Sequence, residues 1–273
     1  MSELEAVTPH DATPHPVAAN GIWRVLVPIL SLLAGFLLWE AAVRAADLPS
    51  YLLPAPSEII AVMAAKWHIL LDQARYTGLA AAVGFVIALA IALVLGALIA
   101  ASEAVERVIY VWLVVFHAVP KVVVAPLLLV WIGFGVKSSI IFVVVFTFFP
   151  MLVNTVTGLR SADPDQILLT RSMGANRWQV LRRVRLPSAL PSIIAGVKIA
   201  ITLAPVGAVV GEFVASNNGL GHMLIQSVGN LEVPTAFGAV VVVSALGLFV
   251  WYLAEWIEAA CIPWHASQRN RRS

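Results

Sequence analysis

Four ionisable side chains lie within long apolar stretches of this sequence: His117, Lys121, Lys198 and Glu212. An ionisable group at bilayer depth is costly to desolvate, so by default it marks the path of a solute or an ion. His117 precedes Lys121 by four residues and would share its helix face, next to a helix break at Pro120. We therefore predict a path lined by these side chains, in which Glu212 has a structural or gating role. The alternative is that each lysine only pairs with a carbonyl group or extends towards the interface.

Metal and nucleotide chemistry are not indicated by the other polar residues. The six histidines are scattered and Cys261 is the single cysteine, so no cluster has metal-ligand spacing. The nearest approach to a Gly-x-x-x-x-Gly-Lys-Ser/Thr phosphate loop is Gly135-Val136-Lys137-Ser138, which lacks the loop length and the glycine before lysine. We expect no catalytic residue, no metal and no cofactor in this chain, which is not predicted to be an enzyme. A formal net charge of only +2 argues against nucleic acid as a partner.

The composition predicts an all-α, polytopic membrane protein. Of the 273 residues, 60% are apolar and 12% are charged, against roughly 45–50% and about 25% in soluble domains. The apolar residues form continuous runs, which favours spanning helices of about 20 residues over a barrel. Glu40 and Arg44 can pair at i,i+4 spacing and so extend the first span. Six spans are predicted within a transmembrane domain of residues 22–260, at about 22–43, 76–102, 108–134, 138–159, 188–213 and 233–257.

The distribution of Lys and Arg predicts the orientation of these spans. Eleven basic residues fall on the side of the termini and four on the other side, with Lys121 and Lys198 left in the membrane. Both termini are thus expected in the cytosol, as a disordered tail of residues 1–21 and a basic tail of residues 261–273. No basic region precedes the first apolar run, so we expect no cleavable signal and a location in the bacterial inner (cytoplasmic) membrane.

Small residues recur at every fourth position in two of the predicted spans. One stripe runs from Gly84 to Ala100 and the other from Gly196 to Ala208. Such stripes let helix backbones approach closely in lipid. We expect them to serve packing within one chain, and a dedicated dimer face is the alternative.

The loop of residues 160–187 is too polar to span a membrane but has helical signals. Asp163 and Pro164 are typical of a helix start, Gly174 of a helix end, and Asn176 of a second helix cap. The second helix is expected to end before Pro187. The loop carries six Arg and two Asp, so the sequence predicts a basic cytosolic helix–Gly–helix elbow. On charge alone, an anchor on anionic lipid is an alternative.

The elbow resembles the "EAA" loop of binding-protein-dependent ABC importer permeases, because Gly174 is followed after nine residues by Val184-Arg185-Leu186-Pro187. Other segments, in the same order, resemble the nitrate/sulfonate/taurine class of these permeases: Leu53-Pro54-Ala55-Pro56-Ser57-Glu58, Ala118-Val119-Pro120-Lys121, Trp131-Ile132-Gly133-Phe134-Gly135, Phe148-Phe149-Pro150, Gly211-Glu212-Phe213 and Gly219-Leu220-Gly221. The chain departs from the family at Leu168-Leu169-Thr170, where the pattern has Glu-Ala-Ala, so the acidic residue is missing. The resemblance implies that the elbow is a coupling helix docked in a cleft of an ATPase subunit, through Leu168, Thr170, Arg171, Met173, Gly174, Ala175, Arg177, Leu186 and Pro187.

The resemblance also implies a set of partners and a mechanism. A second copy of the chain, two cytosolic ATPase subunits that use ATP, and a periplasmic substrate-binding protein would assemble in the lipid bilayer. The chain would then pass a small solute to the cytosol by alternating access, and a small anion such as nitrate or a sulfonate (taurine among them) is expected, with vitamin precursors also known in the class. An ion-coupled secondary transporter is the alternative, although such proteins usually have more helices or an internal repeat, and no repeat is evident here.

Overall fold

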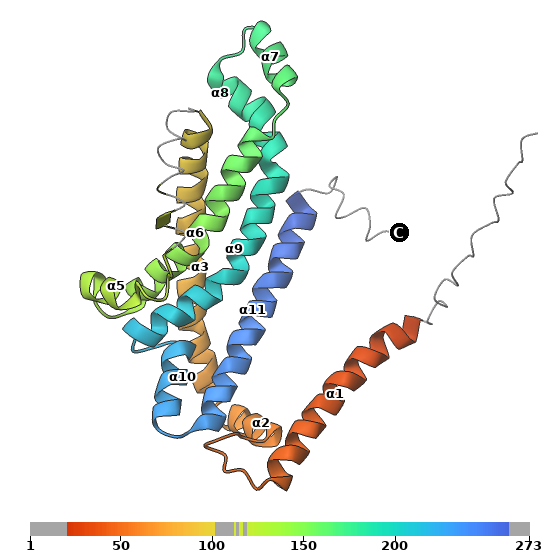
Figure 1. The fold of residues 1–273 in the computed structure, drawn as a ribbon, viewed down its shortest axis with the longest axis vertical. Helices are drawn as coiled ribbons and strands as arrows, with labels where there is room; N and C mark the ends of the chain where they lie inside the picture. The colour runs from red at the N-terminus through yellow and green to blue at the C-terminus, as the bar shows by residue number, and fades with distance from the viewer. Residues whose placement is uncertain (1–20, 102–111, 113–114, 117–118, 262–273) are drawn as a thin grey trace, which may run out of the picture.

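The computed structural model describes residues 21–101, 112, 115–116 and 119–261, and within them the chain is helical, with no strand (Figure 1). This confirms the all-α class. The predicted tails lie almost entirely outside the described residues. In chain order the helices are α1 (Gly21–Ala45), α2 (Pro56–Ala65), α3 (Trp67–Ala101), α5 (Ala125–Ile132), α6 (Val136–Arg160), α7 (Pro164–Ser172), α8 (Arg177–Val180), the π-helix η1 (Leu181–Arg185), α9 (Leu186–Ala215), α10 (Leu220–Gly229) and α11 (Val233–Cys261).

Five helical segments of the described residues are long and apolar enough to cross a membrane. They correspond to five of the six predicted spans, and their bounds are Leu26–Ala45, Trp67–Ala100, Val136–Arg160, Arg177–Ala215 and Val233–Ala260. The second and fourth of these segments are longer than predicted. The membrane-spanning character of the fold therefore agrees with its composition, while a sixth span is not seen in this part of the chain.

The predicted third span, residues 108–134, falls partly outside the described residues, and the part that is described is not one continuous helix. Residues 119–124 are non-helical, and α5 after them has only 8 residues. Pro120 and Pro126 account for the break, because proline lacks a backbone N–H and is tolerated only in a first helical turn, where Pro126 lies. Gly133 and Gly135, at φ +85° and +120°, then turn the chain into α6. The predicted helix break at Pro120 is therefore confirmed, and the described part of the predicted span consists of a turn followed by the short helix α5.

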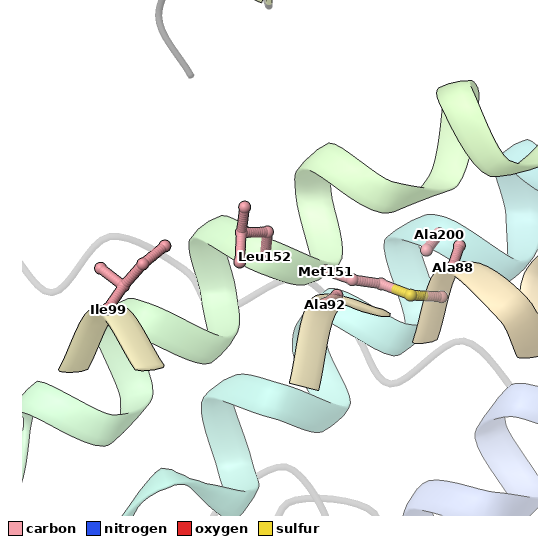
Figure 2. Close-up of a cluster of buried hydrophobic side chains, with 6 residues drawn as sticks. All are labelled: Ala88, Ala92, Ile99, Met151, Leu152 and Ala200. Carbon is pink, nitrogen blue, oxygen red and sulfur yellow. The ribbon is translucent and has the colours of Figure 1, made fainter. Parts of the chain in front are cut away.

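The core of the fold is formed by α3, α6 and α9. Ala88 and Ala92 of α3 and Ala200 of α9 are fully buried against Met151 and Leu152 of α6. Figure 2 shows the Met151 side chain extending across to the two other helices, next to Ala88 and Ala200. The two small-residue stripes thus meet inside one chain, as expected, because short side chains let the backbones approach.

The remaining helices lie at the two ends and on one flank of this core. α2 and α10 pack with α11 at one end, where Leu70, Leu220, Met223 and Ala239 form a second buried cluster. The elbow helices α7 and α8 lie at the opposite end (Figure 1). The fold therefore has an elbow end and an α10 end, joined by α3, α6, α9 and α11.

The helix α1 stands away from the core (Figure 1). Its contacts are at its C-terminal end, where the rings of Trp39 and Phe237 lie 6.0 Å apart. The Glu40 carboxylate accepts a hydrogen bond from Arg44 Nε at 2.6 Å, which confirms the predicted pair, and another from the Ser57 backbone N–H at 3.0 Å. A ring contact and hydrogen bonds to Ser57 therefore tie the C-terminal end of α1 to the body, and most of its apolar surface is left exposed.

Glycine at position 84 allows a test of the close packing between α3 and α6. A Cβ atom there would lie 2.5 Å from Val143 Cβ and 2.7 Å from the Ile140 carbonyl oxygen. We expect Gly84→Ala to cost about 1–3 kcal/mol of stability through overpacking, measured as a lower thermal unfolding temperature in detergent. Gly247→Ala on α11 is the matched control, because no atom lies within 4 Å of its Cβ position. Equal unfolding temperatures for the two variants would contradict the packing.

Candidate functional site

The elbow is built from the local signals that the sequence carries. Asp163 caps α7, with its Oδ1 accepting a hydrogen bond from the Asp165 backbone N–H at 2.9 Å. Gly174 ends the first arm at φ +83°, a conformation that favours glycine. Asn176 caps α8 in a reciprocal pair with Gln179, each side chain accepting from the other residue's N–H at 2.9 Å. The predicted helix start, turn and second cap are thereby confirmed.

The second arm of the elbow does not end before Pro187, contrary to the prediction. It continues through η1 directly into α9. Within η1 the Leu186 N–H donates to the carbonyl of Leu181, five residues back, which is a π-type bond. A proline ring clashes with the carbonyl four residues before it in a regular α-helix, and a wider turn relieves that clash. The helix is therefore unbroken from Arg177 to Ala215, so the second arm of the elbow and α9 form one element.

The base of the elbow is fastened to the core. Arg185 Nη1 donates to the carbonyl of Ala100 at 2.7 Å, in the last described turn of α3. Val180 is buried, and Leu159, Ala189 and Ile193 form a cluster beneath it with Leu181 packed against them. A displacement of the elbow must therefore move α3 and α9 with it.

The elbow exposes four large apolar side chains. Leu168, Leu169, Met173 and Trp178 have exposed fractions of 65%, 64%, 80% and 66%, although this loop is otherwise polar. We call these four residues the elbow patch. Exposed large apolar groups gathered on a polar segment mark an interaction surface. Leu169 and Trp178 are absent from the predicted set of coupling residues. Their apolar side chains in a basic loop were the sequence signal that could have indicated a contact surface.

The other predicted coupling residues are distributed around this patch. Arg171, Gly174 and Arg177 are exposed, and Leu186 and Pro187 are exposed at the first turn of α9. Thr170 and Ala175 are half-buried, and their positions are fixed by hydrogen bonds: Thr170 Oγ1 donates to the Gln166 carbonyl at 2.6 Å, and the Ala175 N–H donates to the Thr170 carbonyl at 3.2 Å. The elbow thus brings the predicted residues together at one end of the molecule.

Lys198, predicted to line a path, is paired with a carboxylate that sequence reasoning missed. Its Nζ donates to Glu258 Oε2 at 2.5 Å and lies 5.6 Å from the ring centre of Trp251, both on α11. These residues line a cavity of about 410 Å³ between α9 and α11, with Pro191, Ala195, Ile199 and Thr202. Glu258, an acidic residue near the end of the last apolar run, was the sequence signal that could have indicated a partner for Lys198. Because the pair is neutral overall, Lys198 supplies no net charge at this depth.

Glu212 has a structural position at the α10 end, in line with one of its two predicted roles. Its buried carboxylate accepts from Thr77 Oγ1 at 3.0 Å and from the Gly221 N–H at 2.8 Å. The Leu220 N–H donates to Thr77 Oγ1 at 2.9 Å, and the Gly219 N–H donates to Gln73 Oε1 at 2.6 Å. Side chains of α3 and α9 therefore satisfy the first N–H groups of α10, which have no intrahelical partners.

The glycines of this turn are required by the same carboxylate. Gly219 has φ +103°, and a Cβ at this position would collide with the carboxylate of Glu212. At Gly221 a Cβ would lie 2.7 Å from the Val209 carbonyl oxygen. The Gly-Leu-Gly segment singled out in the sequence is thus a tight connection that locks α10 against α9.

Lys121 takes no part in either of these two sites. Lys121 lies half-buried in the turn before α5, and no ion pair or hydrogen bond involves it within the described part of the chain. His117 lies outside the described residues. A single polar path through His117, Lys121, Lys198 and Glu212 stays a prediction.

A second ion pair closes the α10 end. Lys66 Nζ donates to Glu232 Oε2 at 2.6 Å and to Thr235 Oγ1 at 3.1 Å, linking the α2–α3 junction to the start of α11. The hydrogen bond from Lys66 lowers the pKa of Glu232 below its ordinary value, so this link is present at neutral pH and weakens as the pH falls through that lowered pKa. The pair borders a polar cavity of about 290 Å³ that Gln73 and His222 also line.

Comparisons with known proteins identify the family. A model described as "Binding-protein-dependent transport system inner membrane component" matches residues 88–262. The chain is 37% identical to the riboflavin transport system permease protein RibX of Chloroflexus aurantiacus, over 90% of this chain and 92% of that protein. It is 33% identical to the formylaminopyrimidine transport permease protein ThiX of Halalkalibacterium halodurans, over 90% and 98%. The chain therefore belongs to the family of binding-protein-dependent transport system inner membrane components.

More distant similarities agree with this assignment. A Bacillus subtilis protein named as an aliphatic sulfonates transport permease, SsuC, is 28% identical over 68% of each chain. Among solved structures, an inward-facing form of the MetNI methionine ABC transporter superimposes with a TM-score of 0.63 at 20% identity, covering 71% of this chain and 97% of that chain. The fold is thus the permease fold of ABC transporters.

The hydrogen bonds of Thr77 allow a test of the α10 lock. Thr77→Val removes the hydroxyl group and leaves the buried Leu220 N–H without its acceptor, so we expect a loss of about 1–3 kcal/mol of stability. Thr147→Val is the control, since Thr147 is equally buried but its hydroxyl group bonds only the Val143 carbonyl of its own helix. Thermal unfolding in detergent should show the larger decrease for Thr77→Val. If the order were reversed, the lock would not be a stabilising feature.

Proposed function

We propose that the chain carries a small solute across the bacterial inner membrane as the permease subunit of an ABC importer, and that the elbow couples it to a separate ATPase. The observation that carries this proposal is the geometry of the elbow. An exposed apolar patch lies on a two-helix arm whose second helix is continuous with α9. A partner that grips the patch acts directly on a helix of the core. ATP hydrolysis belongs to that partner, because this chain is proposed to hold no nucleotide.

The proposed motion is a rocking of helices that the elbow drives. Closure of an ATPase dimer on ATP would draw the elbow inward, and α9 with it, since Arg185 and η1 leave no hinge between them. The core helices would then alternate between openings on the two sides of the membrane. The differential affinity that drives the change is that of ATP for the closed ATPase dimer.

We further propose that two copies of the chain form the pathway. Ile199, Val206 and Phe213 of α9 are exposed although they lie at bilayer depth, and their spacing of seven residues places them on one helix face. A second copy on this face would cover it and enclose the pathway between two α9 helices. A periplasmic binding protein would deliver solute at the α10 end, with the elbow and both termini in the cytosol, as the excess of Arg at the elbow favours.

A secondary transporter driven by an ion gradient is not favoured. Such a protein needs buried groups that take up and release a coupling ion. Lys198 and Glu212 are instead held by Glu258 and by Thr77 with Gly221. These two groups are therefore already engaged within the chain, which weighs against their carrying a coupling ion.

The substrate is proposed from two lines of support. A small anion such as nitrate or a sulfonate is the first candidate, in line with the resemblance to the sulfonate class and with the name of SsuC. A heterocyclic vitamin or its precursor is the second candidate, because the relatives at 37% and 33% identity are named for riboflavin and formylaminopyrimidine.

Ligand titration of the partner binding protein separates these two substrates. Because that protein delivers the solute, a sulfonate is expected to bind with a Kd at least about tenfold lower than riboflavin, a difference of 1.4 kcal/mol. Uptake by cells that express the whole transporter should show the same order. If riboflavin bound more tightly and were taken up in preference to the sulfonate, the heterocycle would be the proposed substrate in place of the anion.

The elbow patch allows a test of coupling. Leu168→Asp places a charge in the proposed apolar contact, so we expect recovery of the ATPase in a pull-down and solute uptake to fall about tenfold or more. The fold should be unaffected, because Leu168 is 65% exposed. Leu52→Asp, at a residue 64% exposed near the start of α2, is the matched control and should retain both activities. Full ATPase recovery with Leu168→Asp would remove the coupling role of the elbow.

A further inference from the structure

A cavity on the elbow carries an excess of positive charge. It measures about 410 Å³ and is lined by Arg171 of α7, by Arg177 and Trp178 of α8, and by Arg185 of η1, together with Val180 and Leu181. Arg171 and Arg177 stand on either side of the Gly174 turn. The turn therefore brings guanidinium groups from both arms of the elbow to one hollow. We call it the arginine cavity.

Nothing in the described residues neutralises this charge. Of the three arginines, only Arg185 has a hydrogen-bond partner, and that partner is the Ala100 carbonyl rather than an acid. The two carboxylates of the elbow lie at the far end of α7, where Asp163 caps the helix. Several guanidinium groups around one hollow repel each other, and an anion placed among them removes that repulsion. The cavity is therefore built to receive negative charge from beyond the described residues.

The surroundings of the cavity favour a protein as the source of that charge. Trp178 belongs both to the cavity and to the exposed elbow patch. Arg and Trp side chains beside exposed apolar groups are typical of the centres of protein–protein contacts. The continuous helix of 39 residues from Arg177 to Ala215 is ~58 Å long at ~1.5 Å per residue, against ~30 Å of hydrocarbon, so its elbow end extends clear of the lipid tails.

We propose that the arginine cavity binds an Asp or Glu side chain of the ATPase subunit, with Arg171 and Arg177 as its ligands and Trp178 packed beside it. This inference rests on the proposed coupling function and specifies its chemistry. Guanidinium groups bind carboxylates through paired N–H donors, which fixes the orientation of the partner as well as its position. In this contact the permease supplies the positive charge and the ATPase the negative charge. The acidic residue of the family pattern is absent from this elbow, where Leu168 takes its place.

Paired charge reversals test the cavity against general electrostatic attraction. The double variant Arg171→Glu, Arg177→Glu should lower ATPase recovery with the full-length permease by about tenfold or more. Arg182→Glu, Arg183→Glu makes the same change in net charge at two exposed arginines of η1 that do not line the cavity, and should lower it less than about twofold. Equal losses in the two double variants would overturn the proposal.

A rescue experiment identifies the partner group. Acidic residues on the surface of the ATPase are changed to Lys one at a time and combined with the Arg171→Glu, Arg177→Glu permease. We expect one such change to restore recovery about tenfold, because the two charges of the contact are then exchanged. If none of them restores recovery, the cavity does not bind an ATPase carboxylate.

Two further measurements separate other outcomes. In nanodiscs of phosphatidylcholine with or without phosphatidylglycerol, the unmodified transporter should recover equal amounts of ATPase. If recovery instead requires phosphatidylglycerol, and the variant Arg171→Glu, Arg177→Glu abolishes that requirement, the cavity binds a lipid headgroup. That result would overturn the proposal. Leu168→Asp keeps all three arginines of the cavity. If Leu168→Asp lowers recovery and Arg171→Glu, Arg177→Glu does not, only the cavity assignment fails, whereas full recovery with both variants removes the coupling function as well.

Discussion

The continuity of the helix from Arg177 to Ala215 is the constraint on which the rest of the structure depends. A proline near the start of a helix normally ends the segment before it, but the π turn at Leu181–Arg185 provides the room that Pro187 needs. Small residues along the same helix let α3 and α6 pack at close range. One element therefore carries Trp178 of the elbow patch at one end and the Glu212 lock at the other, with the core between them.

The two ends of this element are held in different ways. At the elbow end, Arg185 binds the Ala100 carbonyl of α3, and an apolar cluster lies below it. At the α10 end, polar side chains of α3 and α9 cap a short helix, and the Lys66–Glu232 pair closes the outside. Buried polar groups that are fully paired define one geometry, because any shift leaves them unpaired. The elbow end is thus held by a hydrogen bond and an apolar cluster, whereas the α10 end is also held by a network of paired polar groups.

Local signals in the sequence were sufficient for the elbow, since Asp163, Gly174 and Asn176 each act within a few residues. Composition was sufficient for the class of fold, and five of the predicted spans follow from apolar length. The failures concern non-local effects. The rule that proline stops a helix predicted the break at Pro120 but did not anticipate a π turn at Pro187. The partner of Lys198 lies 60 residues away, and only the packing of α9 against α11 brings Glu258 to it.

The loose attachment of α1 has a consequence for how such chains vary. The family model matches residues 88–262 and so excludes α1. Through the part of α1 from Leu26 to Leu38 the side chains are almost all exposed, and the contacts of the helix with the body are concentrated near Trp39 and Glu40. Substitutions on that exposed length need only preserve its apolar character, because no complementary surface of the same chain constrains their shape. The length and sequence of this helix can therefore vary among related chains with little effect on the transporting core, provided that the hydrogen bonds between Glu40 and Ser57 are kept.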